Sequence, residues 1–292
     1  MGMGAFGAAM TQFLAQDRYV DSVAPTSEPA LLQLQRRMFR YYAGTPYPDF
    51  VTPQAWGAES HAVHFKLCKH IPDGSRVLEL GCGDGTNIRL IKANTRGVSY
   101  LGCDISLVRL RGSAQRAGAG LTLASADTLP LPDQSVDVTL SIFVIEHVVF
   151  PARFLDEQWR VLRSGGRLLL IAPDFSTSGM AAEHIGLSYG SGSQKLRRLR
   201  VLDALLTGYD TRVAISRARA QRRTRTRAGI CAFPVLTNPR CLDMPGFVPD
   251  CDAIYPACPE EIVQYLQRHS DARSALIFYR DKHKFGLMVE KA

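Results

Sequence analysis

Residues 76–86 read Arg-Val-Leu-Glu-Leu-Gly-Cys-Gly-Asp-Gly-Thr, so a short apolar strand runs directly into three alternating glycines. The strand reserves no face for water, which is typical of a strand buried on both sides of a parallel sheet. Gly81, Gly83 and Gly85 allow a backbone with positive φ, and a ligand can then lie against the main chain where the next helix begins. The stretch therefore predicts the nucleotide-binding turn of an α/β fold.

The spacing of these glycines bears on which nucleotide binds. A dinucleotide fingerprint, Gly-x-Gly-x-x-Gly, starting at Gly81 would need a glycine where this chain has Thr86. Glu79 stands just before the glycines, and its carboxylate would repel a pyrophosphate but suits a cation or an amino group. Both observations disfavour NAD as the ligand.

A second carboxylate ends the next predicted strand. Residues 98–103 read as a strand, and Asp104 follows it, nineteen residues after Gly85. A carboxylate at the tip of the second strand can accept hydrogen bonds from both ribose hydroxyls, so the spacing supports an adenosine ligand. Asp104 also suits the N-cap of a helix beginning at Ser106, and this alternative does not exclude the ribose contact.

The glycine turn resembles motif I of the class I S-adenosylmethionine-dependent methyltransferases. The order of predicted elements resembles that family over residues 70–173 and again near the C-terminus. Residues 129–137, Leu-Pro-Leu-Pro-Asp-Gln-Ser-Val-Asp, resemble more closely the subgroup that includes the ubiquinone and menaquinone C-methyltransferases. The resemblance implies a methyltransferase with S-adenosylmethionine as its cofactor, whose methionine portion lies against the acidic residue and the glycine loop.

The same resemblance implies where the cofactor binds. Its contacts would come from the glycine turn, the tip of the second strand, the loop after the third strand and the end of the fourth. These residues are Glu79, Gly81, Cys82, Gly83, Gly85, Asn87, Asp104, Ile105, Ser125, Ala126, Asp127 and Ile142. The family usually has an aspartate where this chain has Ser125, and the carboxylate comes two residues later at Asp127, so either residue is a candidate for the adenine contact.

Glu146 and His147 follow the predicted fourth strand, residues 136–143, and the family places such a pair near the meeting point of cofactor and acceptor. A histidine that titrates near neutrality is a natural general base for a hydroxyl or amine acceptor, so His147 is the first catalytic candidate and Glu146 the second. His184 and Tyr189 are weaker candidates. The alternative is that His147 only fixes its loop by hydrogen bonds.

The predicted fold is an α/β, Rossmann-like, seven-stranded and mostly parallel sheet with helices on both faces. Residues 1–70 form a helical N-terminal cover, 71–173 and 259–292 the methyltransferase core, and 174–258 a basic lid inserted after strand five. Aromatic side chains of the cover, among them Tyr42, are expected to pack it onto the core rather than to line a pocket. An insertion at this place lies above the carboxyl ends of the strands, where ligands bind.

The lid carries most of the charge of the chain. Eleven Lys and Arg against two Asp lie between Lys195 and Arg227, whereas the whole chain has a net charge of +8. Lys195 to Leu206 predicts one amphipathic helix with leucines on one face. The first interpretation of the arginines is that they form a solvated helix face. The functional interpretations are that they bind RNA phosphates, or that they bind a smaller anionic or membrane-borne substrate. Tyr209 is the only aromatic residue there, which disfavours base recognition.

The end of the lid is rich in proline and carries Asp243, Asp250 and Asp252. These carboxylates could orient an amine or a sugar hydroxyl, but residues of turns next to proline are the favoured interpretation. The chain has seven cysteines, an odd number, and no Cys-x-x-Cys pair. This usage favours a reduced, cytoplasmic protein with neither a disulfide framework nor a zinc or other metal site.

Together these features predict transfer of a methyl group to the oxygen or nitrogen of a small, possibly anionic molecule, as in natural-product or glycan tailoring. An RNA methyltransferase that uses the basic insertion to hold phosphates is the alternative. No apolar run reaches the ~20 residues that span a bilayer. The sequence does not predict the acceptor or the oligomeric state.

Overall fold

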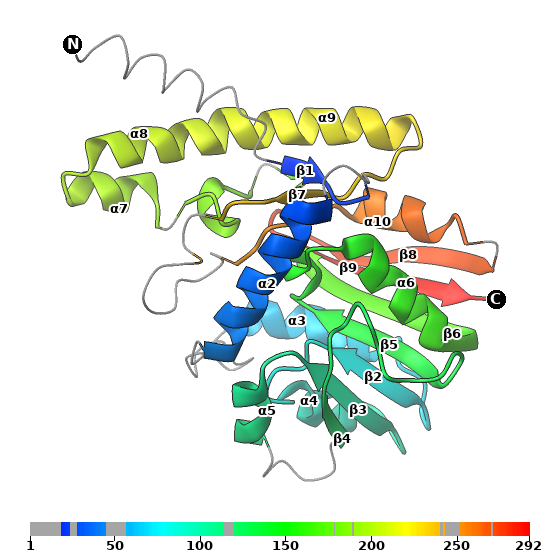
Figure 1. Ribbon diagram of the computed structural model, residues 1–292. Helices are drawn as coiled ribbons and strands as arrows, with labels where there is room; N and C mark the ends of the chain where they lie inside the picture. The colour runs from blue at the N-terminus through cyan, green and yellow to red at the C-terminus, as the bar shows by residue number, and fades with distance from the viewer. Residues whose placement is uncertain are drawn as a thin grey trace, which may run out of the picture.

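The computed structural model describes residues 19–23, 28–44, 57–113, 120–177, 179–188, 190–239, 242, 252–269 and 271–292. Its centre is a sheet of seven strands (Figure 1), in the order β4-β3-β2-β5-β6-β9-β8. The strands are β2 (Arg76–Leu80), β3 (Ser99–Asp104), β4 (Gly120–Leu123), β5 (Val136–Ile142), β6 (Leu162–Pro173), β8 (Ala272–Arg280) and β9 (Lys284–Lys291). Only β9 runs antiparallel to its neighbours β6 and β8. The predicted mostly parallel, Rossmann-like sheet is confirmed.

Helices cover both faces of this sheet, because successive side chains of a strand point to opposite faces and both sets are apolar here. Leu78, Leu168 and Leu170 belong to the larger of two buried clusters, which also takes in residues of α2 (Glu28–Gly44), α6 (Pro151–Val161) and α10 (Pro259–Leu266). Leu140 and Leu169 belong to the second cluster, with residues of α3 (Gly57–Cys68) and α4 (Asn87–Asn94). Helix α5 (Leu107–Ser113) follows β3.

The insertion after β6 is largely helical. It contains a 3-10 turn (Ala182–His184), α7 (Gly192–Arg197), α8 (Val201–Tyr209), a π-helical turn (Asp210–Ala214), α9 (Ile215–Arg227) and β7 (Pro234–Leu236). Helices α8 and α9 continue one another through the π-helical turn and form a long rod over the sheet (Figure 1). Among the described residues, no helix is both long and apolar enough to cross a membrane.

The single helix predicted over 195–206 is wrong, because the chain reverses between α7 and α8. Leu199 has a left-handed backbone with φ of +58°. The amide of Leu199 donates to Leu196 O at 2.9 Å, and the amide of Arg200 donates to Lys195 O at 2.9 Å. This is the Schellman ending of a helix, in which a left-handed residue satisfies the last carbonyl groups. Leucine spacing predicted the helical segments but not the turn between them.

A short strand joins the N-terminal segment to the insertion, although no strand was expected in residues 1–70. Strand β1 (Tyr19–Asp21) pairs antiparallel with β7, with Tyr19 opposite Leu236. Three residues are too few to show the alternation by which a strand is recognised in a sequence. The Arg225 Nη1 atom of α9 also donates to Asp21 Oδ1 at 2.5 Å, so β1 contacts the insertion at two places.

The solvated face predicted for the arginines holds for only part of α9. Arg217, Arg223 and Arg227 are exposed, but Arg222 is 4% exposed and its Nε lies 3.8 Å from Glu261 Oε2. Arg219 donates from Nε to Phe175 O at 2.8 Å and from Nη2 to Met180 O at 2.9 Å. Part of the basic segment therefore fastens the insertion to the core.

Candidate functional site

The glycine turn after β2 has the backbone that its sequence predicts. Gly81, Gly83 and Gly85 have φ of +69°, +55° and +71°. A Cβ atom at Gly81 would come within 2.5 Å of Val144 Cγ2, so the loop after β5 closes directly onto the turn. A Cβ at Gly83 would come within 2.8 Å of Arg109 Cζ. The left-handed backbone favours glycine at both positions, and at Gly81 the contact with the branched Val144 side chain adds a steric reason.

Asp104 at the end of β3 is built into this turn. Its Oδ2 accepts the amide of Gly83 at 2.8 Å, and its Oδ1 accepts the amide of Ser106 at 2.8 Å. Burial raises the pKa of Asp104, while these hydrogen bonds and the Arg109 guanidinium lower it. The carboxylate thus fixes the turn and lies beside it, so the capping contact and the predicted ribose contact are compatible.

Glu79 lies beneath the turn, with 1% of its surface exposed. Its Oε1 accepts the Asn87 side-chain amide at 2.6 Å, and its Oε2 accepts the Tyr100 hydroxyl. Burial raises the pKa of Glu79 to about 7, against the opposing effect of these two hydrogen bonds. Glu79 and Asn87 are therefore brought together as predicted, but as a buried pair below the turn.

The loop after β4 lies beside the same edge of the sheet. The amide of Ala124 donates to Asp104 O at 3.1 Å, which fixes the start of the predicted adenine-binding residues. The Ser125 hydroxyl donates to Asp127 Oδ1, and Asp127 Oδ2 accepts the side-chain amide of Gln35 from α2 at 2.8 Å. Ser125 and Asp127 thus form one polar pair, and both remain candidates for the adenine contact.

The other predicted cofactor-binding residues flank the turn and the strand ends. Cys82 and Ile142 are buried, Cys82 within the turn and Ile142 at the end of β5; Ile105 and Ala126 are half-buried, in the loops after β3 and β4. Burial raises the pKa of the Cys82 thiol, with the nearby carboxylates adding to the effect. Cys82 is therefore a packed apolar side chain rather than a nucleophile.

The candidate base lies in a 3-10 turn after β5 (Ile145–His147). His147 Nδ1 is 3.5 Å from Asp252 Oδ2, and His147 Nε2 is 3.7 Å from Glu146 Oε1. Both carboxylates are almost fully buried, whereas the imidazole is 20% exposed. The imidazole of His147 therefore lies between two buried carboxylates.

A chain of contacts connects the carboxylate of β3 to this histidine. Beside Asp104, the Ser106 hydroxyl donates to Tyr42 O at 3.0 Å, and the Tyr42 hydroxyl donates to Asp252 Oδ2 at 2.7 Å. Asp252 in turn faces His147. The cover helix α2 therefore bridges the predicted ribose edge and the predicted base.

Tyr42 and Asp252 are site residues that sequence reasoning missed. Tyr42 packs against the core as expected, and its hydroxyl also donates to Asp252. Asp252 lies in a turn as expected, but it is buried, with 1% exposed. The two residues are 210 positions apart in the chain. The only signal was the presence of aspartates in an insertion expected above the strand tips. The neighbouring Asp243 and Asp250 lie outside the described residues.

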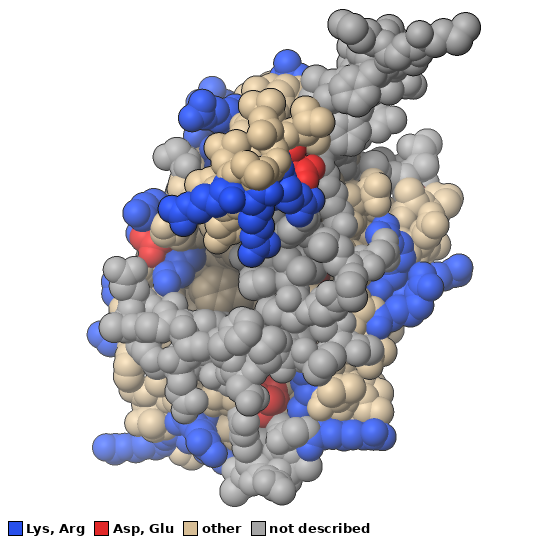
Figure 2. Space-filling view, turned by 90° about the vertical axis from the view of Figure 1, so that its left-hand side faces the viewer, with Lys and Arg blue, Asp and Glu red and all other residues tan. Residues whose placement is uncertain are grey.

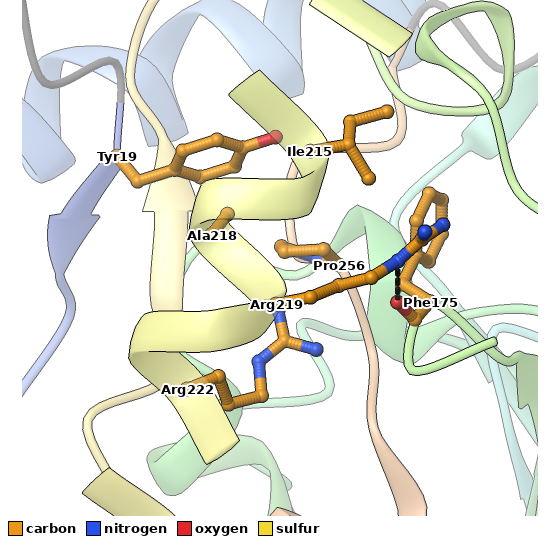
Figure 3. Close-up of a pocket in the computed structure, with 7 residues that line it drawn as sticks. All are labelled: Tyr19, Phe175, Ile215, Ala218, Arg219, Arg222 and Pro256. Carbon is orange, nitrogen blue, oxygen red and sulfur yellow. Dashed lines mark hydrogen bonds between the residues drawn. The ribbon is translucent and has the colours of Figure 1, made fainter. Parts of the chain in front are cut away.

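One weaker candidate and one cavity lie apart from this cluster in the described part of the chain. His184 accepts the amide of Ala181 on Nδ1 at 2.9 Å, a local turn contact, and Tyr189 lies outside the described residues. A small cavity between α9 and the core is drawn in Figure 3, with the Arg219 side chain reaching Phe175 O across it. Its described lining is Tyr19, Phe175, Ile215, Ala218, Arg219, Arg222 and Pro256, none of which is a predicted cofactor or catalytic residue.

The residues present fit the cofactor that the sequence resemblance implies. The glycines leave space beside the backbone of the turn, because a Cβ atom added at Gly81 would meet Val144 and one added at Gly83 would meet Arg109. A hydroxyl acceptor, Asp104, lies against the turn, and a buried carboxyl, Glu79, lies below it. An adenosyl group and a positively charged sulfonium match this pair of carboxyl groups in hydrogen bonding and in sign of charge.

Comparison with known proteins agrees with this geometry. Residues 78–170 match the family described as "Methyltransferase domain". Residues 78–170 are therefore similar to a methyltransferase domain. The match begins inside β2 and ends inside β6, so it covers the glycine turn, Asp104 and the Glu146–His147 pair of this domain.

Curated relatives share the methyltransferase domain. A probable S-adenosylmethionine-dependent methyltransferase of Mycolicibacterium smegmatis is 37% identical over 117 residues, 39% of this chain and 44% of that protein. Phthiotriol/phenolphthiotriol dimycocerosates methyltransferase 1 of Mycobacterium ulcerans is 30% identical over 164 residues, 55% of this chain and 58% of that protein. The chain thus spans less than two thirds of the length of these relatives.

The solved structure of the PH0226 protein from Pyrococcus horikoshii aligns with 87% of this chain and with 99% of its own length. Its TM-score is 0.51 and its sequence identity is 15%. At this identity the likeness concerns the fold alone, which agrees with the sheet order found for the methyltransferase domain.

Proposed function

We propose that this chain is an S-adenosylmethionine-dependent methyltransferase that methylates a hydroxyl or amine of a small-molecule acceptor, with His147 as the general base. The observation that carries the proposal is the run of contacts from Asp104 through Ser106, Tyr42 and Asp252 to His147. These contacts connect two places. One is the end of β3 that would bind the ribose, and the other is the imidazole of His147, which lies between two carboxylates.

When bound, S-adenosylmethionine supplies a methyl group on a positively charged sulfur. The glycine turn and Asp104 would hold the adenosyl part, and Glu79, when it is ionised above its raised pKa of about 7, would favour a positive charge nearby. Asp252 beside His147 Nδ1 keeps a proton on that nitrogen, which leaves Nε2 to take the proton from the acceptor. Glu146, 3.7 Å from Nε2, stabilises the resulting imidazolium. Alignment of the acceptor then supplies much of the acceleration.

The contacts of the arginine segment favour a small acceptor over RNA. Arg219 and Arg222 are turned into the protein, and Arg225 contacts Asp21, so these three side chains are engaged by the fold itself. The relative that is named for phthiotriol and phenolphthiotriol dimycocerosates is named for an acceptor that is not a nucleic acid. Asp252 above the strand ends also gives a site suited to a hydroxyl or amine.

The decisive experiment gives the purified protein S-adenosylmethionine with a labelled methyl group, together with the small-molecule fraction or the RNA fraction of a bacterial extract. We expect label in small molecules, insensitive to ribonuclease. Label that ribonuclease releases would overturn the choice of acceptor. Binding of the cofactor with no transfer to either fraction would overturn the assignment as an enzyme.

His147→Ala should lower kcat by about 100-fold or more, the usual contribution of a general base, with almost unchanged cofactor affinity. Calorimetry and single-turnover rates measure the two effects. Asp252→Asn should lower kcat less and shift the pH–rate profile, because Asp252 positions His147 rather than touching the acceptor. Equal turnover of His147→Ala and the unaltered protein would remove the histidine from this role.

A further inference from the structure

The turn between α7 and α8 exposes an unusual amount of apolar surface. Of fifteen large hydrophobic side chains exposed in the part of the chain described here, five lie within ten residues of this turn. They are Leu196 (53% exposed), Leu199 (87%), Val201 (52%), Leu202 (61%) and Leu205 (65%). Single exposed leucines are ordinary, but five that adjoin on one projecting turn form a patch of the kind that binds a partner. We call these five side chains the leucine tip.

The leucine tip is surrounded by positive charge. Arg197, Arg198 and Arg200 are all exposed and alternate with the leucines along the turn. Among the described residues, Arg200 pairs with Asp203, whereas Arg197 and Arg198 make no ion pair. Figure 2 looks onto this end of the molecule and shows lysine and arginine side chains, in blue, around residues that carry no charge, in tan.

The α7–α8 hairpin is held firmly behind this tip. The ammonium group of Lys195 is buried and donates to the hydroxyls of Ser188 and Thr207, the latter at 2.7 Å. Ser191 caps α7 by accepting the amide of Gln194 at 3.3 Å. The leucines therefore stand outward on a braced hairpin that projects to one side of the sheet (Figure 1).

The backbone conformation of Leu199, in the turn between α7 and α8, costs free energy that glycine at this position would not. Its φ of +58° lies in the left-handed region, which glycine adopts freely and a leucine does not. A glycine is the usual residue at this place in a Schellman ending. A large apolar side chain that is 87% exposed therefore stands at a position where glycine would be less strained.

We propose that the leucine tip docks the protein onto a bilayer surface that contains anionic phospholipids. The leucines enter the boundary between headgroups and acyl chains, and Arg197, Arg198 and Arg200 meet the phosphate groups. A convex tip with a cationic ring matches a deformable anionic surface better than it matches a preformed groove. Long arginine side chains can extend to the headgroups while the leucines lie deeper. The inference does not depend on the methyl acceptor.

Sedimentation with lipid vesicles tests this docking. We expect the full chain to sediment with vesicles of phosphatidylcholine and phosphatidylglycerol in equal parts, much less with phosphatidylcholine alone, and less as salt screens the charges. The Leu199→Gly/Leu202→Ser variant should bind roughly 10-fold more weakly or worse, from the loss of two inserted leucines. The Arg197→Gln/Arg198→Gln variant should bind about 20-fold more weakly, since each arginine near an anionic surface contributes modestly.

Matched controls separate docking from folding. Leu199→Gly alone should unfold at the same temperature as the unaltered protein or a higher one, because it removes the left-handed strain, and yet bind vesicles more weakly. Leu276→Ser on β8 (Leu276 is 45% exposed) and Arg96→Gln should leave binding unchanged. Absence of sedimentation, or binding unaltered in the tip variants, overturns the proposal. If the protein self-associates and the tip variants abolish this self-association, then the leucine tip binds a second copy of the chain, and the docking proposal is overturned as well.

Discussion

At the scale of single residues, Glu79 is the carboxyl group whose burial has the clearest consequence. Its pKa is raised from 4.5 to about 7 in the folded protein. Between these values the unfolded chain has released the proton and the folded protein still binds it, so stability falls as pH rises through this window. Above pH 7 both states are ionised and the loss is complete.

Glu79→Gln should remove this pH dependence. Unfolding by urea at several pH values should show the unaltered protein losing up to about 3 kcal/mol between pH 4.5 and 8, relative to the variant. Asp104, whose pKa is also raised, is present in both proteins, so the difference reports Glu79 together with its repulsion by Asp104. Parallel pH profiles of the two proteins would show that Glu79 is ionised throughout.

Gly81 is the second residue whose replacement has a specific outcome. Gly81→Ala should lower the free energy of unfolding by about 2–4 kcal/mol, since left-handed strain and a 2.5 Å contact with Val144 add together. Gly165→Ala is the control, because Gly165 has φ of +73° and no atom within 4 Å of an added Cβ. Adding Val144→Ala to Gly81→Ala should recover the steric part. Equal losses at Gly81 and Gly165 would argue against the close approach of the loop.

At the scale of elements, the buried pair of Arg222 and Glu261 fastens α9 to α10. Glu261 Oε1 accepts the amides of Ala232 and Phe233, both at 3.1 Å, and its Oε2 accepts the Tyr255 hydroxyl at 2.9 Å. The Glu261 carboxylate thus accepts hydrogen bonds from the insertion where the chain returns to the core. It also lies beside the buried guanidinium of Arg222. The basic helix is held by this pair together with the contacts of Arg219, Arg223 and Arg225.

Removing one member of this pair should cost more than removing both. Glu261→Gln should lower the free energy of unfolding by about 3–5 kcal/mol, because it leaves the Arg222 guanidinium buried without a carboxylate. Arg222→Met combined with Glu261→Gln should recover much of the loss, while Arg217→Gln on the exposed face should change stability by less than about 0.5 kcal/mol. Urea unfolding measures all three, and simple additivity of the two single changes would contradict the pairing.

At the scale of the whole molecule, the site is assembled from three parts of the chain. The core supplies the glycine turn and His147, α2 supplies Tyr42, and the insertion supplies Asp252. The backbone amides of Ile254 and Tyr255 donate to Glu146 O at 2.7 and 2.9 Å, which fixes the returning insertion against the catalytic candidates. A ligand at the turn should therefore stabilise the protein as a unit.

Saturating S-adenosylmethionine should raise the stability of the unaltered protein by about 2.7 kcal/mol at a concentration 100 times the Kd, seen as a higher Tm. Asp104→Asn should lose most of this shift at the same concentration, because the ribose acceptor is changed. Asp203→Asn, on the exposed α7–α8 hairpin, is the matched control and should keep the full shift. A full shift in Asp104→Asn would contradict the predicted cofactor edge.

The sequence by itself determined the glycine turn, Asp104 and the order of the core strands, because each depends on residues close together in the chain. Local spacing sets a buried strand, a positive φ and the carboxylate at a strand tip. Only the tertiary structure decided that Asp252 lies beside both Tyr42 and His147, that β1 pairs with β7, and that the chain reverses at Leu199. Apart from the local turn at Leu199, these contacts join segments up to 217 residues apart, and their energy comes from burial that no local pattern records.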